Sequence, residues 1–185
     1  GPSAEGGMSL VVVALGKLGG EELNYSSDID LLLLADQPDV DTLKIAQHLV
    51  RELGRMTGEG FLYRVDMRLR PWGRSGPLVA DVAAYADYLE THAAPWELQA
   101  LVKARVIAGD RVVGERALAD VSRLIVERGR SGRRETVREM KRRIEEALPR
   151  ELREYGEVKS GVGSIRDIEF VTQFLQLQNA EEHPE

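Results

Sequence analysis

The chain has 185 residues, a formal net charge of −6 and no cysteine. With 43% hydrophobic residues, a chain of this length can bury the core of one compact domain. The absence of cysteine excludes disulfides, thiolate nucleophiles and cysteine-based zinc sites, and it fits a reducing, cytoplasmic compartment. The acidic balance argues against a general nucleic-acid-binding protein, and no apolar run approaches the roughly 20 residues that a membrane span needs.

Two apolar runs in the first part of the chain predict buried strands. The opening residues 1–7, GPSAEGG, are typical of a protease-cleavage remnant followed by a linker, so we exclude them and expect the natural chain to begin upstream. The run from Ser9 to Leu15, SLVVVAL, stops at Gly16, which predicts a strand that enters a tight glycine turn. The run from Ile29 to Ala35 predicts a second strand.

A helix and a two-faced strand are expected next. Apolar residues recur at three- and four-residue steps from Asp41 to Met56, which predicts a helix with Asp41 as its cap. The following segment, FLYRVDMRLRP, alternates strictly between apolar and polar residues, so one face should meet the core and the other should form a polar wall. The polar residues are Arg64, Asp66, Arg68 and Arg70.

The remainder of the chain has a helical pattern. We expect helices over Asp81 to Thr91, Pro95 to Ala108, about Val112 to Glu127 and about Arg133 to Tyr155. A final helix should begin at the capping box Ser164-x-x-Asp167. Strands with one helix, followed by helices, predict an α+β fold with a helical C-terminal extension.

Asp28 and Asp30 stand out because they interrupt an aliphatic run, in the stretch GKLGGEELNYSSDIDLLLL. Residues two apart on a strand share a face, so both carboxylates should project together while Ile29 and Leu31 pack on the opposite side. Two close carboxylates repel each other, and a divalent cation is the simplest compensation. Oxygen-only ligands select hard ions such as Mg²⁺ or Mn²⁺, which commonly carry substrate phosphates.

Asp66 and the arginines near it extend this hypothesis. If the two strands are neighbours, three carboxylates, those of Asp28, Asp30 and Asp66, meet an arginine wall. Such an arrangement suits two-metal phosphoryl or nucleotidyl transfer. Arg68 and Arg70 are the candidates for phosphate contacts, and salt bridges to Asp66 or to nearby glutamates are the alternative.

The glycine turn fits the same chemistry. Bare backbone at Gly16, Gly19 and Gly20 can approach a phosphate and offer N–H donors, while Lys17 and Ser27 could add a cation and a hydroxyl. A plain turn is the alternative for this segment. It is not a Walker loop, because no GK[ST] sequence closes it.

Four segments carry a more specific signal: LGKLGGEELNYSSDIDLLLL, YRVDMRLRPWGRSGPLV, YLETHAAPWELQALVKARVIAGD and KSGVGSIRDIEFVTQFLQL. In this order they resemble the signature blocks of the bacterial glutamine synthetase adenylyltransferase/adenylyl-removing enzyme family, and they cover most of the chain. The resemblance implies a DNA polymerase β-like nucleotidyltransferase fold, with a small mixed sheet and flanking helices. The catalytic core would cover residues 8–110, and the helical extension residues 111–185.

The resemblance also implies a set of site residues. The family pattern of a glycine turn, an acid pair and a later third acid falls on Asp28, Asp30 and Asp66, as catalytic residues that bind Mg²⁺ or Mn²⁺. Nucleotide, as ATP or ADP, and phosphate are expected at Gly16, Lys17, Gly19, Gly20, Ser27, Arg68 and Arg70.

The direction of the reaction is predicted from wording that differs between the two halves of such enzymes. One half attaches AMP to a tyrosine of glutamine synthetase, and the other removes it by phosphorolysis. Asn24, Ser26, Ser27, Arg64 and Pro77 resemble the removing half. We therefore expect an adenylyl-removing domain that regulates nitrogen assimilation, with glutamine synthetase and, in the full-length enzyme, the PII signalling protein as partners.

Two other functions stay open on the sequence. The first is ATP-dependent adenylylation of the same tyrosine. The second is a catalytically silent module that binds a nucleotide or a partner. A nucleic-acid nucleotidyltransferase of the same fold is disfavoured by the acidic balance and by the lack of an aromatic, basic channel.

Overall fold

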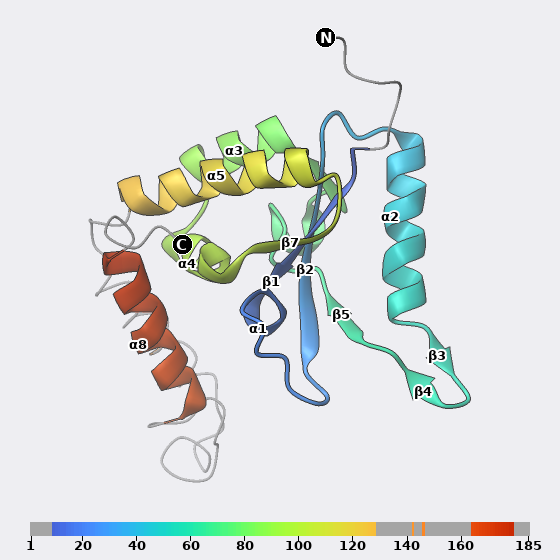
Figure 1. Cartoon of the computed structure of the whole chain (residues 1–185), viewed down its shortest axis with the longest axis horizontal. Helices are drawn as coiled ribbons and strands as arrows, with labels where there is room; N and C mark the ends of the chain where they lie inside the picture. The colour runs from blue at the N-terminus through green and yellow to red at the C-terminus, as the bar shows by residue number, and fades with distance from the viewer. Residues whose placement is uncertain (1–8, 129–141, 143–145, 147–163, 180–185) are drawn as a thin grey trace. The chain divides into compact units, whose positions relative to one another are not determined.

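The structure, a computed structural model, describes residues 9–128, 142, 146 and 164–179 (Figure 1). It divides into two compact units. The first consists of Gly1–Ala93 and Lys103–Val121, and the second of Ala94–Val102 and Ser122–Glu185. None of the helices in the described ranges is long and apolar enough to cross a membrane.

A mixed sheet forms the centre of the first unit. Its strands are β1 (Val11–Leu15), β2 (Asp28–Ala35), β5 (Arg64–Asp66), β6 (Val79–Asp81) and β7 (Arg105–Gly109). The order is β5-β2-β1-β7, and β6 also pairs with β2. β1 runs antiparallel to β2 and β7, whereas β5 and β6 run parallel to β2. The predicted α+β class and the first two strands are confirmed.

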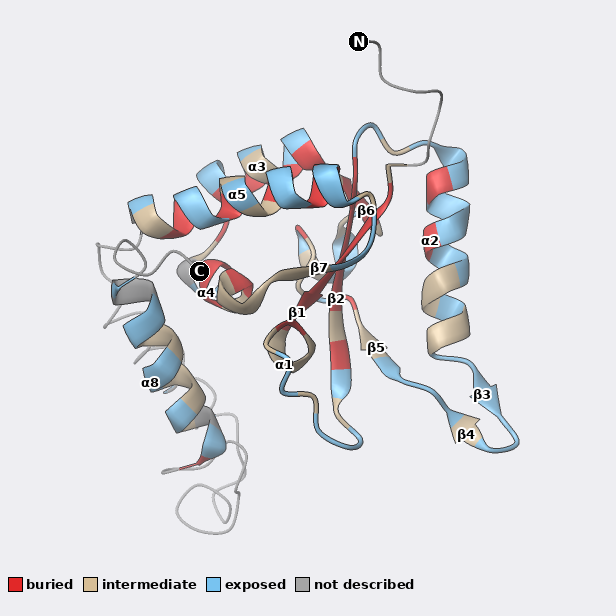
Figure 2. Cartoon of the chain, viewed as in Figure 1, coloured by how far each residue is buried: buried red, intermediate tan, exposed pale blue. Residues whose placement is uncertain are grey.

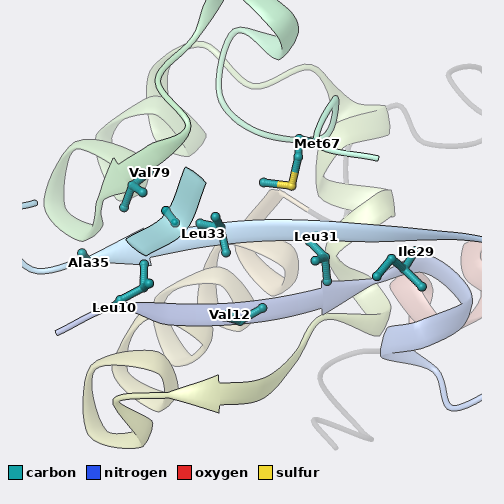
Figure 3. Close-up of a cluster of buried hydrophobic side chains, with 9 residues drawn as sticks. Leu10, Val12, Ile29, Leu31, Leu33, Ala35, Met67 and Val79 are labelled. Carbon is teal, nitrogen blue, oxygen red and sulfur yellow. The ribbon is translucent and has the colours of Figure 1, made fainter. Parts of the chain in front are cut away.

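β1 and most of β2 are buried, whereas Asp28 at the start of β2 is exposed (Figure 2). One face of the sheet carries a cluster that includes Leu10, Val12, Ile29, Leu31, Leu33, Ala35, Met67 and Val79 (Figure 3). Leu49, Val50 and Leu53 of α2 (Val40–Leu53) pack against this cluster. Strand alternation therefore sends the even-numbered side chains of β2, including Asp28 and Asp30, to the opposite face.

The alternating segment forms a much shorter strand than predicted. Only Arg64–Asp66 pairs with β2, and a small hairpin of β3 (Met56–Thr57) and β4 (Gly60–Phe61) precedes it. The chain turns after Asp66, whose carboxylate accepts the backbone N–H of Arg68 at 2.9 Å. The pairing of β5 with β2 ends at Asp66, where this local hydrogen bond turns the chain.

The helix predicted over Pro95 to Ala108 is wrong in its second half. The helix α4 covers Pro95–Ala100, with the proline at its start as predicted, and a 3₁₀ turn follows at Leu101–Lys103. Arg105–Gly109 then forms β7, which pairs with the free edge of β1. The strand β6 was not predicted either. Both short strands are apolar segments whose state depends on the edge they pair with.

The predicted helix over Asp81 to Thr91 is observed as α3 (Val82–Thr91), with Asp81 as its cap. The predicted helix near Val112 to Glu127 is observed as α5 (Arg111–Arg128).

In the second unit, α8 (Ile165–Gln178) confirms the last predicted helix. The predicted capping box is wrong, because the Ser164 side chain makes no cap hydrogen bond, and its buried hydroxyl has no partner among the described residues. The helix predicted from about Arg133 to Tyr155 lies outside the described residues, apart from positions 142 and 146. The predicted boundary between residues 110 and 111 stays a prediction.

The cap of α2 also differs from the prediction. Asp39, in an extended conformation, accepts the backbone N–H of Thr42 at 2.7 Å, whereas Asp41 lies in the first turn and pairs with Lys44. Because a cap must precede the first turn, the cap falls two residues earlier than predicted.

This assignment predicts different effects for two neighbouring aspartates. Asp39→Ala should lower the melting temperature by about 2–4 °C, because it leaves a helix N–H without its acceptor. Asp41→Ala should change it by less than half as much, because it removes only an exposed ion pair. Thermal unfolding followed by circular dichroism makes the comparison, and equal effects would contradict the assignment.

The hydrogen bonds of the Asp81 carboxylate should make the stability of the fold depend on pH. Its carboxylate accepts the backbone N–H groups of Ala84 at 3.0 Å and Gln37 at 2.9 Å, and these bonds lower its pKa below the ordinary 3.8. A lowered folded pKa adds stability above pH 3.8 that is lost as the pH falls through the folded value. The difference in unfolding free energy between wild type and Asp81→Asn should therefore shrink when urea titrations are moved from pH 5 to pH 3. A difference that stays constant would contradict this role.

Candidate active site

Three carboxylates occupy one face of the sheet at the end where β2 begins. In the parallel register of β2 and β5, Asp30 lies opposite Asp66 and Asp28 lies opposite Arg64. Neighbouring strands place paired residues on the same face, so all four side chains leave the sheet together. The condition stated from the sequence, that the two strands are neighbours, is met. Ile29 belongs to the buried cluster on the other face, and its partner Val65 packs against that cluster.

Asp28 is held by an arginine that the sequence did not single out as a site residue. The Nε of Arg64 donates to the Asp28 carboxylate, and its Nη2 donates to the backbone carbonyl of Ser26. Ser26 has φ +59°, a left-handed conformation that is uncommon outside glycine. Arg64 therefore connects β5 to the loop that leads into the acid pair. Its position on the polar face of the alternating segment was the available signal.

Asp66 is held by Arg68. The Nε of Arg68 lies 2.7 Å from Asp66 Oδ2 and 3.0 Å from Oδ1, and its Nη2 also donates to this carboxylate. The hydrogen bond from Arg68 is the main reason that the pKa of Asp66 lies below its ordinary value. A carboxylate that stays ionised so readily is a better ligand for a cation than a proton acceptor.

Arg68 also responds to the other two acids. Its pKa is raised first by Asp66, with smaller electrostatic contributions from Asp30 and Asp28. The guanidinium of Arg68 therefore lies close enough to all three carboxylates to interact with their charges.

The glycine turn lies next to the acids. It forms α1 (Gly16–Gly19), which begins at Gly16 with φ +54°. A Cβ atom on Gly16 would lie 2.7 Å from Oδ2 of Asp30, so only a residue without a side chain allows this approach. The amide of Gly20 donates to the Gly16 carbonyl at 3.1 Å, which closes the turn.

Residues before and within β7 hold the turn in place. A Cβ atom on Gly19 would lie 2.0 Å from the carbonyl oxygen of Lys103, so the absence of a side chain there serves packing within the chain. Arg105 donates to the carbonyls of Leu18 and Gly19 at 3.1 Å each, and Lys103 Nζ lies 2.7 Å from Glu22 Oε2. These contacts connect distant segments, and sequence spacing gave no signal for them.

The remaining predicted phosphate-binding residues have different surroundings. Arg70 donates to the backbone carbonyls of Met67, Arg74 and Gly76, so it orders the loop that follows β5. Lys17 lies half-buried in α1. Ser27 immediately precedes β2, and its backbone N–H donates to the backbone carbonyl of Asn24 at 3.2 Å. Phosphate contacts at these positions and at the glycines stay predictions.

The donor set fits a hard divalent cation by position but not by present side-chain conformation. Asp28, Asp30 and Asp66 provide only oxygen ligands from adjacent positions of one sheet face, as Mg²⁺ or Mn²⁺ requires. Among the described residues, however, no group of three acidic, histidine or cysteine side chains is arranged to hold a metal ion. Two of the three carboxylates are directed to arginines instead.

An acid pair, a third acid on the neighbouring strand and adjoining arginines are typical of proteins that transfer phosphoryl or nucleotidyl groups. Residues 2–120, more than half of the chain, match the family model described as glutamate-ammonia ligase adenylyltransferase, and the chain belongs to this family. By its description, this is a family of nucleotidyltransferase enzymes. The resemblance expected from the four sequence blocks is confirmed.

A curated relative supports the same family. The bifunctional glutamine synthetase adenylyltransferase/adenylyl-removing enzyme of Thioalkalivibrio sulfidiphilus (strain HL-EbGR7) is 41% identical over 187 residues, which includes 95% of this chain. The chain spans 19% of the length of that relative. Residues 138–183 also match a second family model, described as GlnD PII-uridylyltransferase, so the two matches fall on different parts of the chain.

The packing of Gly19 gives a testable prediction for the turn. Gly19→Ala should lower the free energy of unfolding by about 1–3 kcal/mol, because the added methyl group meets backbone atoms of Lys103 and Ala14 that cannot move independently. Gly58→Ala is the matched control, since a Cβ atom there has no neighbour within 4 Å. Urea unfolding measures both variants, and equal stability would show that the turn can shift without cost.

Proposed function

We propose that the chain is a nucleotidyltransferase domain of the DNA polymerase β-like fold that removes AMP from a tyrosine of adenylylated glutamine synthetase. The observation that carries the proposal is the register of β2 with β5, which puts Asp28, Asp30 and Asp66 on one face beside the glycine turn. Family membership supports the reaction class. A Mg²⁺ or Mn²⁺ ion held by these three carboxylates would neutralise charge on the reacting phosphates.

The chemistry balances with inorganic phosphate as the second substrate. An oxygen of hydrogen phosphate bonds to the phosphorus of the tyrosyl-AMP, and the bond from that phosphorus to the tyrosine oxygen breaks. The proton of hydrogen phosphate goes to the tyrosine oxygen, so the products are ADP and free tyrosine. The protein contributes alignment and charge neutralisation, which are the main requirements of phosphoryl and nucleotidyl transfer.

In this reaction the side chains have separate roles. Asp28, Asp30 and Asp66 hold the cation. Arg68 would bind the anionic substrate, because its guanidinium lies beside Asp66 and can pair with phosphate oxygens. Gly16 keeps the backbone of the turn close to Asp30, beside the proposed cation site.

Removal rather than addition of AMP is proposed from the family resemblance. Asn24, Ser26, Ser27, Arg64 and Pro77 resemble the removing half of such enzymes. Arg64 also pairs with Asp28 at the acid pair. The relative from Thioalkalivibrio carries both activities in its name, so adenylylation is the alternative.

Regulation by the PII signalling protein is proposed for the full-length enzyme. The match of residues 138–183 to a PII-uridylyltransferase family supports a link with that signalling system.

Two parallel assays test the proposed reaction. The chain should release ADP from adenylylated glutamine synthetase when Mg²⁺ or Mn²⁺ and phosphate are supplied, and Asp30→Asn should reduce this turnover at least 100-fold, because one ligand of the cation is lost. Asp36→Asn is the matched control, since Asp36 follows the other end of β2 and pairs with Arg116. It should keep wild-type turnover.

The second assay separates the alternatives. Transfer of label from ATP to unmodified glutamine synthetase, without ADP release in the first assay, would reverse the proposed direction. Nucleotide binding without turnover in either assay would identify a silent binding module.

A further inference from the structure

We propose that Arg64 and Arg68 are exchangeable counter-ions, which neutralise the acids before a divalent cation binds and are released toward phosphate when it does. This inference rests on the proposed function and adds to it an order of binding, with the cation before the phosphate. It also adds Arg64 to the phosphate-binding residues.

The first observation is that the two arginines hold the carboxylates a cation would use. Arg64 pairs with Asp28, and Arg68 pairs with Asp66 through both of its carboxylate oxygens. The sheet register places these acids on one face, yet no group of three acidic, histidine or cysteine side chains among the described residues is arranged to hold a metal ion. Arg68 engages both oxygens of Asp66, and Arg64 engages one oxygen of Asp28. A divalent cation therefore competes with both arginines for these carboxylates.

The second observation is that both arginines can move. The side chains of Arg64 and Arg68 are 54% and 64% exposed, so their guanidiniums already lie largely in water. Arg64 also donates to one backbone carbonyl, that of Ser26, whereas Arg70 is fixed by three. A released guanidinium at the edge of the sheet stays near the acids because its strand, β5, remains paired with β2.

Charge explains why the order matters. Asp28 and Asp66 each hold a guanidinium, so these two arginines are not available to an incoming phosphate dianion. A divalent cation adds two positive charges and frees the guanidiniums, each of which can form paired hydrogen bonds with phosphate oxygens. Phosphate should therefore bind well only after the cation.

The test uses the whole chain and two probes, Mn²⁺ and inorganic phosphate. Arg64→Gln should bind Mn²⁺ about three- to tenfold more tightly than wild type, because Asp28 no longer has a competing cation. In excess Mg²⁺, the same variant should bind phosphate about three- to tenfold more weakly, because a phosphate ligand is lost. Electron paramagnetic resonance of free Mn²⁺ and ³¹P NMR titration give the two affinities.

Exchange predicts that Arg64→Gln changes the two affinities in opposite directions, with Mn²⁺ bound more tightly and phosphate more weakly. A merely structural role of Arg64 would weaken both affinities or neither. Arg116→Gln is the matched control, because the pair of Arg116 with Asp36 has nearly the same exposure, 54% and 48%, as the 54% and 49% of Arg64 with Asp28. It should leave both affinities unchanged. Arg64→Lys keeps the charge and should stay within about twofold of wild type for Mn²⁺.

The outcomes also separate this inference from the proposed function. Wild type that binds Mn²⁺, with Arg64→Gln no tighter, overturns the exchange and leaves the metal-dependent reaction in place. Wild type that binds no Mn²⁺, with Asp30→Asn the same, overturns the metal-dependent reaction and the exchange together. If Arg64→Gln does not fold, Arg68→Gln carries the same test, with the same opposite signs expected.

Discussion

The parallel pairing of β2 with β5 is the contact on which the acidic site depends. It sets Asp30 opposite Asp66 and sends both to the same face, while on the other face Ile29 joins the buried cluster and Val65 packs against it. A shift of one residue would bury the carboxylates and expose the apolar side chains. The hydrophobic core therefore fixes the register, and the register in turn gathers the acids.

Repulsion among the three carboxylates is then managed by neighbouring groups. Arg64 and Arg68 neutralise two of them, and Arg68 responds to all three. The glycine turn approaches Asp30 because Gly16 has no side chain, and the residues near β7 keep that turn in position. The site thus consists of a rigid sheet edge, a fixed turn and two exposed cations that are able to move.

Much of this arrangement follows from the sequence, because strand alternation is a local property. The two central strands, the shared face of Asp28 and Asp30, and the helices α2, α3 and α5 are all visible as apolar periodicity. The short strands β6 and β7 are not, since each consists of an apolar segment that becomes a strand only when a sheet edge is available. The cap at Asp39 was missed by two residues, because several polar residues near a helix start can serve equally well by pattern.

The sequence by itself determined the α+β class, the acid pair with its third carboxylate and the family, because these depend on residue type and spacing along the chain. Only the tertiary structure decided which side chains meet across segments. It paired Arg64 with Asp28 across two strands, and it placed Lys103 and Arg105 against a turn more than 80 residues away in the chain. Such contacts depend on how the sheet brings distant segments together, and residue type alone does not encode that order.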